Sequence, residues 1–510
     1  MPKRPVFCDI TLRDGNQSLK KPWNIKEKER IFDLIAALNI PVVEAGFAAS
    51  SQMDFDTLRK ICEKAPSSMK IASLARTVEN DILRALDAIK PSKNSRIHTF
   101  IATSPFHMKY VLNKSPEQVK KIAVDAVKFI RDKAGKYTDI EFSAEHFGDC
   151  DDNLDFVIGV FKDVVKAGAN VINLPNTVER TRIKNFLNMV EKVREELPED
   201  VQISVHCHND LGMATATTVE SYFSGAVQLE CCLNGLGERA GNTNFYEVTV
   251  ALHNSGVETG IELSKIYETA LIVSEMSKTA IYDKAPLIGK EALAHRSGIH
   301  QDGALKTKDM DKGAYRPINP ELIGRKDSET LGITSQSGKT AVFEVITEAG
   351  YPITIKEAER IAPVVKAAAE KIGELPTRNI TDIYFAQVFN IKGAFALKSF
   401  EKYSNNSYRT IFSFNGKEYE KICEGNGPVD ACMNALKECG FEQNLLDYEQ
   451  KAVDGEIFGS GATAMTVMRF VDKNGNVIIS RGMDKDTEKA NVKAIFNGFN
   501  ILYSEKSKKV

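Results

Sequence analysis

Two histidines one residue apart, His206 and His208, are the clearest candidates for chemistry in this chain. They lie in the run 202–208, whose composition predicts a strand. Side chains alternate between the faces of a strand, so both imidazoles would share one face while Cys207 turns to the other. Such a pair can bind one metal ion. The same spacing is more often found in core or surface histidines, so further ligands are needed to support a metal site.

Asp14 and Asn242 are candidates for those further ligands. A divalent metal binds nitrogen and oxygen ligands that converge from several elements. Asp14 follows the first apolar run of the chain and Asn242 follows a later one. Each also fits an ordinary turn, since Gly15 follows Asp14 and Gly241 precedes Asn242. Only their convergence on the histidine pair would favour a metal site.

Arg13, next to Asp14, adds a fixed positive charge. Its guanidinium stays protonated near neutral pH and presents a planar fork of donors, which suits a carboxylate or a developing oxyanion. The structural alternative is a salt bridge to Glu44 or Glu145. The two interpretations are compatible.

The elements that must position these residues alternate between short apolar runs and longer amphipathic segments, a pattern typical of parallel strands joined by helices. Strands are expected at 5–10, 41–47, 70–74, 96–102, 139–143, 170–174, 202–208 and 227–233, with helices such as 26–38, 116–133 and 153–167. Eight such units over about 250 residues predict a (β/α)8 barrel. A doubly wound open sheet is the alternative, but no Gly-x-Gly-x-x-Gly follows the first strand.

Catalytic groups in such a barrel lie at the carboxyl ends of the strands. The polar residues at the predicted strand ends are Asp14, Glu44, Glu145, Thr177, His206, His208 and Asn242. Their coincidence at one barrel mouth favours a single site over a set of unrelated turns.

After the barrel the pattern of the sequence changes twice, which predicts two further parts. The expected domains are a catalytic barrel at 1–280, linker subdomains at 281–380 and a C-terminal α+β regulatory domain at 381–510. Helical segments are expected within 339–372. The last part combines strand-like runs at 383–389 and 410–414 with a Gly-Asn-Gly-Pro sequence at 425–428 that would open a helix closed by Gly440. A glycine-rich turn at 459–462 precedes the apolar run 465–471.

Composition narrows the class of partner. Lys and Arg number 67 against 69 Asp and Glu, a net charge of −2 that offers no general attraction for nucleic acid or an anionic membrane surface. Nine cysteines without a Cys-x-x-Cys pair argue against a disulfide framework and a cysteine zinc finger. No run approaches the ~20 apolar residues of a membrane span. We expect a cytoplasmic protein with small-molecule partners.

Seven motifs together carry a family resemblance. They are DITLRDGNQ (9–17), EAGF (44–47), RIHTF (96–100), HCHND (206–210), GLGERAGN (235–242), SGIHQDG (297–303) and GNGPVD (425–430). These motifs resemble those of the 2-isopropylmalate synthase family, which belongs to a superfamily of metal-dependent acyl-CoA condensing enzymes and lyases built on a (β/α)8 barrel. The resemblance covers nearly the whole chain.

The resemblance implies a role for each matching residue. The metal ligands would be Asp14, His206, His208 and, as a further candidate, Asn242. Arg13 would hold the keto acid oxygens, Thr177 its carboxylate, and Glu44 and His98 would line the keto acid pocket. Glu145, and His300 supplied by a partner subunit, would be the candidates for moving protons.

The implied reaction is condensation of acetyl-CoA with 3-methyl-2-oxobutanoate, the first committed step of leucine biosynthesis. The implied cofactors are a divalent cation (Mg, Mn or Zn) and, as a further candidate, a K⁺ activator. Leucine would inhibit at the C-terminal domain of a homodimer. Citramalate and homocitrate synthases, which use pyruvate or 2-oxoglutarate, share the chemistry and remain alternatives. A retro-aldol lyase and a non-catalytic metal-binding regulatory protein are more distant ones.

Three positions and one loop depart from the commoner family pattern. Asn16, Asn176 and Arg296 stand where many relatives have Glu, Asp and Glu, respectively. The stretch 459–464 only loosely resembles the family's glycine-rich effector loop. The departure in the loop bears on leucine inhibition more than on catalysis.

Overall fold

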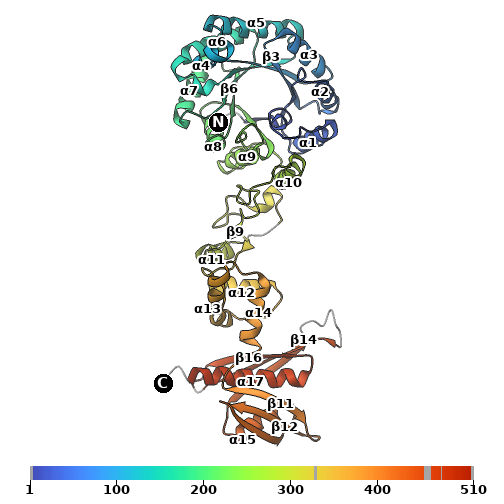
Figure 1. Cartoon of the computed structure of the whole chain (residues 1–510), viewed down its shortest axis with the longest axis vertical. Coiled ribbons are helices and arrows are strands. Elements are labelled where there is room, and N and C mark those ends of the chain that lie inside the picture. Colours follow the sequence, from blue (N-terminus) through green and yellow to red (C-terminus); the bar gives the residue numbers. More distant parts are fainter. Residues whose placement is uncertain (1–3, 327–329, 453–460, 473, 507–510) are drawn as a thin grey trace. The chain divides into compact units, whose positions relative to one another are not determined.

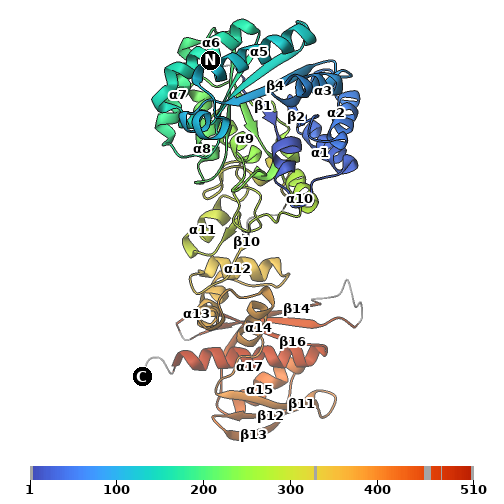
Figure 2. The ribbon, with the colours of Figure 1, turned by 45° about the horizontal axis from the view of Figure 1, so that its top comes forward.

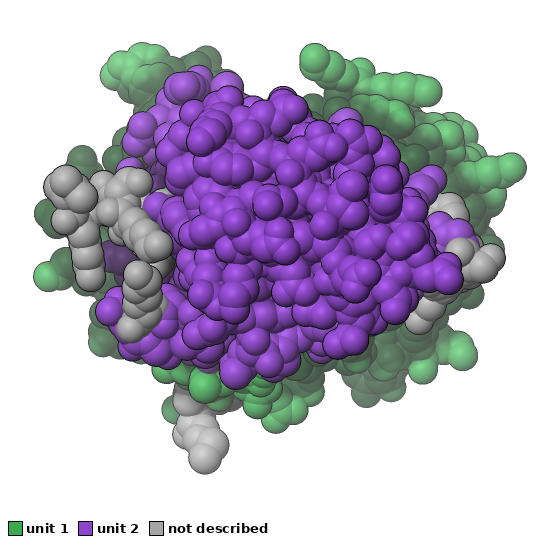
Figure 3. Space-filling model, turned by 90° about the horizontal axis from the view of Figure 1, so that it is seen from below, with its two compact units in different colours: residues 1–293, 309–328 green, residues 294–308, 329–510 purple. Residues whose placement is uncertain are grey.

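A computed structural model describes residues 4–326, 330–452, 461–472 and 474–506. It divides the chain into two compact units, which Figure 3 colours separately. The first contains Met1–Leu293 and Asp309–Ser328, and the second contains Ala294–Lys308 and Glu329–Val510.

Eight parallel strands of the first unit close into a barrel in sequence order, with β8 paired to β1 (Figure 1). They are β1 (Val6–Asp9), β2 (Val42–Gly46), β3 (Lys70–Arg76), β4 (Ser95–Ala102), β5 (Asp139–Glu145), β6 (Val171–Asn176), β7 (Gln202–Cys207) and β8 (Gln228–Cys231). The closed barrel confirms the predicted fold class and excludes the open-sheet alternative.

Helices surround this barrel (Figure 1). They are α1 (Ile25–Ala37), α2 (Gln52–Lys64), α3 (Glu79–Ile89), the short α4 (Pro105–His107), α5 (Pro116–Ala134), α6 (Leu154–Ala167), α7 (Ile183–Glu196), α8 (Ala214–Phe223), α9 (Phe245–Asn254) and α10 (Ile266–Ser277). Local sequence fixes where several of these helices begin. Asn24 and Glu27 form a capping box at α1, and Ser115 and Gln118 form another at α5.

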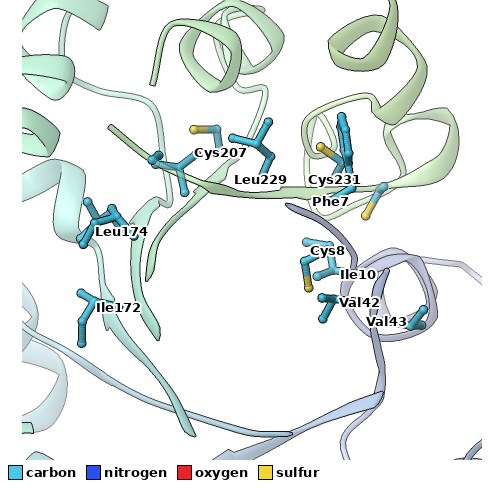
Figure 4. Packing of buried hydrophobic residues seen from close by; sticks show 14 of the residues in the cluster. Phe7, Cys8, Ile10, Val42, Val43, Ile172, Leu174, Cys207, Leu229 and Cys231 are labelled. Atoms are coloured by element: carbon cyan, nitrogen blue, oxygen red, sulfur yellow. The ribbon is translucent and has the colours of Figure 1, made fainter. Parts of the chain in front are cut away.

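The outward faces of the barrel strands build the main hydrophobic core under the helices, and Figure 4 shows part of it. Phe7 of β1 packs edge-on against Phe245 of α9 with ring centroids 5.3 Å apart. Burying one such aromatic side chain contributes roughly 1.5–3 kcal/mol. The inner face differs, because strand alternation turns Gln228 and Glu230 of β8 into a buried polar interior.

The second unit begins with small helical elements. They are α11 (Gly298–Lys306), α12 (Lys339–Glu348), α13 (Ile355–Ile372) and α14 (Thr377–Val388), with a two-stranded sheet of β9 (Ala294–His295) and β10 (Thr330–Leu331). The helices expected within 339–372 are confirmed.

The prediction of a strand at 383–389 was wrong. This stretch forms the second half of α14 and its C-cap, and Ile380, Tyr384 and Val388 recur every four residues on the buried face of the helix. Tertiary packing against α12 and α13 selects the helix over the strand propensity of the local aromatic and β-branched residues. The boundary expected at 380/381 therefore falls inside a helix.

Two three-stranded antiparallel sheets complete the unit (Figure 2). Their elements are β11 (Phe395–Lys402), β12 (Ser407–Phe414), β13 (Lys417–Glu424), α15 (Pro428–Glu438), β14 (Asn444–Ala452), β15 (Ala464–Val471), β16 (Val477–Asp484) and α17 (Thr487–Lys506). The helix opened by Gly-Asn-Gly-Pro and the strand in 465–471 are confirmed. Gly459 and Ser460 of the predicted turn lie outside the described residues. No helix in the described ranges is long and apolar enough to cross a membrane.

Candidate active site

A short helical turn after β1, η1 (Thr11–Gly15), presents Arg13 and Asp14 at the carboxyl end of the barrel. Asp9 fixes the start of this turn, since its carboxylate accepts hydrogen bonds at 2.9 Å from both the backbone N–H and the hydroxyl of Thr11. The Thr11 hydroxyl in turn accepts from the backbone N–H of Leu233 at 2.8 Å, which ties the turn to the segment after β8.

Asp14, His206 and His208 meet at this end of the barrel. Each offers one ligand atom, and these atoms lie within 4.8 Å of one another. His208 Nδ1 is buried without a hydrogen-bond partner among the described atoms, and all three side chains are almost fully buried. An orphaned imidazole nitrogen beside a carboxylate fits a divalent metal, so the residues present are suited to such an ion.

Asn242 lies beside this cluster through a backbone bridge to His208. Its amide nitrogen donates to Asp14 Oδ1 at 2.9 Å. Its Oδ1 atom is buried and lacks a partner in the described part of the chain. Asn242 therefore positions Asp14 and retains an oxygen with unused acceptor capacity.

Burial and charge give the cluster the protonation states that metal binding needs. Burial lowers the pKa of His206 to about 4 and that of His208 to about 3, which leaves both imidazoles neutral near pH 7. Burial alone would raise the pKa of Asp14, but the positive charge of Arg13 holds it well below its usual range. Neutral histidine and ionised aspartate are the metal-binding forms.

Arg13, Glu44 and His98 form a charged chain beside the cluster. Arg13 contacts Asp14 through Nη1 and Glu44 through Nε, while the other Glu44 oxygen contacts His98 Nδ1. Burial alone would lower the pKa of His98, but Glu44 raises it to about 9. Burial alone would raise the pKa of Glu44, but Arg13 and His98 bring it to about 2. The guanidinium of Arg13 is therefore held in place by two carboxylates, those of Asp14 and Glu44.

These residues surround a cavity of about 340 Å³ at the barrel mouth. Its walls are formed by Arg13, Asp14, Gln17, Phe47, Leu74, His98, Phe100, Ser143, Glu145, Asn173, Pro175, Thr177, His206, His208, Glu230, Glu238 and Arg239. Seven of the residues singled out from the sequence, namely Arg13, Asp14, His98, Glu145, Thr177, His206 and His208, are among them.

The other three sequence candidates lie elsewhere. Glu44, expected to line the keto acid pocket, instead lies behind its wall, because Arg13 and His98 both contact its carboxylate and cover it. Asn242 is hydrogen-bonded to Asp14 and is not part of the cavity wall. His300 is an exposed residue of α11 in the second unit, with its ring 6.3 Å from that of His295.

Thr177 is prepared to donate a hydrogen bond. Its hydroxyl oxygen accepts the backbone N–H of His146 at 3.0 Å, which leaves the hydroxyl proton for another acceptor. His146 reaches it in a left-handed conformation, φ 61°, that is uncommon for a non-glycine residue. Local backbone strain of this kind is found more often at functional sites.

Sequence reasoning missed three inward-facing residues, Ser143, Asn173 and Glu230. Ser143 Oγ lies 2.6 Å from His98 Nε2 and accepts from Asn173 Nδ2 at 2.9 Å, so these residues form one polar wall of the cavity. Each is a polar residue with apolar residues on both sides along its strand, and Ser143 stands two residues before Glu145 on the same face. That alternation was the available signal.

A second histidine cluster, formed by His107, His146 and Asp149, is less suited to a metal. The two imidazole rings stack at 3.5 Å with an interplanar angle of 21°. A metal bound in the plane of one stacked ring would not lie in the plane of the other. Arg180 also lies 3.3 Å from the Asp149 carboxylate and would repel a cation.

Three family models match the chain. The HMGL-like model matches residues 4–273, which include the barrel. The model of the alpha-isopropylmalate synthase post-catalytic domain matches 291–347, and that of the LeuA allosteric (dimerisation) domain matches 379–503. The last of these indicates a dimerising, allosteric domain at the C-terminal end.

Curated relatives match most or all of the chain. The chain is 36% identical to a 2-isopropylmalate synthase of Dictyoglomus turgidum, with full coverage of both chains. It is 36% identical to one of Pyrococcus furiosus over 98% of this chain and 100% of the relative. It is 49% identical to 2-isopropylmalate synthase 2 of Leptospira interrogans over 72% of this chain and 86% of the relative.

Proposed function

Because the chain belongs to the 2-isopropylmalate synthase family, we propose that it condenses acetyl-CoA with 3-methyl-2-oxobutanoate and water to give 2-isopropylmalate and CoA. The observation that carries this proposal is the cavity in which Asp14, His206 and His208 lie next to the Arg13 fork. That arrangement suits a 2-oxo acid, whose carboxylate and keto oxygens need a cationic environment.

The metal ligands would be Asp14, His206 and His208, with Asn242 Oδ1 as a further candidate. A divalent metal bound there would polarise the keto carbonyl and so favour attack by the carbanion of acetyl-CoA. Mg, Mn and Zn all suit two histidines with oxygen ligands, and K⁺ is a further candidate activator. Asp14 has a second role, because its contact with Arg13 sets the position of the guanidinium.

Arg13 would stabilise the alkoxide that develops as the new carbon–carbon bond forms, since its donors are already held in place by Glu44 and Asp14. The Thr177 hydroxyl would donate to the substrate carboxylate. Glu145, at the end of β5 and on the cavity wall, is the candidate base for the acetyl-CoA methyl proton. His300, from a partner subunit, is the other candidate for moving protons.

The cavity wall also bears on the acceptor. Leu74, Phe100 and Pro175 contribute apolar surface that would accommodate a branched aliphatic group. The second carboxylate of 2-oxoglutarate would need another cation. The other cations of the wall are already paired, Arg239 with Asp210 at 2.8 Å and His98 with Glu44. These features support 3-methyl-2-oxobutanoate over 2-oxoglutarate, with pyruvate as the remaining alternative.

Release of free CoA from acetyl-CoA with each of the three keto acids tests this proposal. We expect kcat/KM to be highest with 3-methyl-2-oxobutanoate in the presence of a divalent cation. A preference for pyruvate would reassign the chain to citramalate synthesis. No release with any of the three acids would refute the condensing function and leave the lyase and non-catalytic alternatives.

The C-terminal match supports a regulatory proposal as well. We propose that the chain forms a homodimer and that leucine inhibits it at the LeuA domain. Titration of the reaction with leucine, with isoleucine as a control, measures this directly. Unchanged rates of CoA release up to millimolar leucine would contradict the proposed inhibition by leucine.

A further inference from the structure

Glu230 is a buried carboxylate with one hydrogen-bonding contact among the described residues. It belongs to β8 and is 1% exposed. Its Oε2 atom lies 2.9 Å from Nδ1 of His206. Its Oε1 atom is buried and has no hydrogen-bond partner in the described ranges. A buried carboxylate satisfied at one oxygen is costly, so its presence calls for a reason.

The neighbouring polar network does not supply that reason. Two residues earlier on the same strand, Gln228 bonds Glu141 and Ser204. Arg96 donates to Glu141 at 2.8 Å, so both Glu141 oxygens have partners. In this inner network Glu141 is satisfied by an arginine and an amide, while Glu230 is directed at the imidazole of His206.

We propose that Glu230 is a positioning residue for metal binding, acting through His206. Nδ1–H of His206 would donate to the Glu230 carboxylate, which fixes the tautomer and leaves Nε2 for the ion. The ion in turn would add positive charge beside Glu230, whose neighbour His98, within 4.8 Å, is already paired with Glu44. The inference rests on the proposed metal-dependent function, and it assigns to β8 a share in a site whose ligands come from other segments.

Two substitutions separate the contributions of charge and hydrogen bond. In Glu230→Gln the amide oxygen can still accept from Nδ1–H, so the imidazole stays oriented while the charge is lost. In Glu230→Met both are lost at similar side-chain length. We expect affinity for Mn²⁺ to fall about 10-fold in the first and about 100-fold in the second, the range found when such partners of metal ligands are removed.

Glu141→Gln is the matched control, since it removes a carboxylate from the same buried interior without touching a metal ligand. The full-length protein, stripped of metal by a chelator, is titrated with Mn²⁺, and free Mn²⁺ is followed by electron paramagnetic resonance. Circular dichroism checks that each variant is folded. The thermal shift that saturating Mn²⁺ induces provides a second readout, which we expect to shrink in both Glu230 variants.

The outcomes distinguish the two proposals. Wild-type protein that binds no Mn²⁺, Mg²⁺ or Zn²⁺ would refute the proposed metal-dependent function. Wild-type protein that binds Mn²⁺ with the same affinity as Glu230→Gln and Glu230→Met would overturn the role of Glu230 alone. An equal loss of Mn²⁺ affinity in Glu141→Gln would also overturn this role, because any carboxylate removed from the buried interior would then have the same effect. If Glu230→Met does not fold, Glu230→Gln decides.

Discussion

Arg13 in the barrel and Arg481 in the second unit are both largely buried and paired with carboxylates, yet their surroundings differ. Arg13 contacts Asp14 and Glu44 and still lines an open cavity. Arg481 of β16 is enclosed by helical elements. It donates to Glu357 of α13 at 3.0 Å, to the Tyr384 hydroxyl of α14 at 3.4 Å and to the carbonyl of Pro352.

The difference separates charge held for chemistry from charge held for architecture. An arginine at a cavity keeps a donor face for a ligand, and its carboxylate partners orient it. An enclosed arginine has only internal partners, and here these join the linker helices to the C-terminal sheet. The shared core of α12–α14 with Met465 and Val467 of β15 makes the same connection with apolar contacts.

Replacement of Asp14 by Ala should produce the largest effect. It removes a metal ligand, and loss of the metal's several kcal/mol of charge stabilisation should lower kcat/KM by at least about 10³-fold. The barrel should stay folded, because Arg13 retains Glu44. Metal content and CoA release measure the loss, and fluorescence of Trp23, the chain's one tryptophan and a buried residue of the barrel unit, reports unfolding. If the variant loses both its metal and its fold, the metal has a structural role instead.

Replacement of Arg481 by Met should act on stability and spare the barrel. Removing one partner of a buried ion pair costs about 3–5 kcal/mol because the other charge is left unpaired. Calorimetry should therefore record a lower unfolding temperature for the second unit, while the Trp23 transition stays in place. Addition of Glu357→Gln should recover part of the loss. A parallel shift of the Trp23 transition would show that the two units unfold together.

The His98–Glu44 pair should give the barrel a bell-shaped pH dependence of stability. The raised pKa of His98, about 9, makes its contribution complete below pH 6.5 and lost as pH rises through 9. The lowered pKa of Glu44, about 2, makes its contribution complete above pH 4.5 and lost as pH falls through 2. The loss on the alkaline side should be on the order of 3 kcal/mol. Urea unfolding followed by Trp23 measures it, and His98→Gln should flatten that limb.

The pattern of the sequence was sufficient to predict the barrel and the convergence of most of the candidate site residues. Alternation of apolar runs with amphipathic segments predicted all eight strands. The rule that functional groups lie at the carboxyl ends of strands predicted that Asp14, His206 and His208 converge, and their ligand atoms lie within 4.8 Å of one another. The motifs then identified the family, which the relatives confirm over the full chain.

The packing of the folded chain determines which side chains reach the cavity and which support it. Glu44 and Glu230 both follow from strand alternation as inward-facing, but only packing shows that Arg13 and His98 cover Glu44, while Glu230 reaches the cavity wall and contacts His206. The segment 383–389 became a helix for the same reason. Local sequence sets the period and direction of side chains, whereas burial depth and partner choice depend on residues that are 24 to 54 positions away for Glu44 and Glu230.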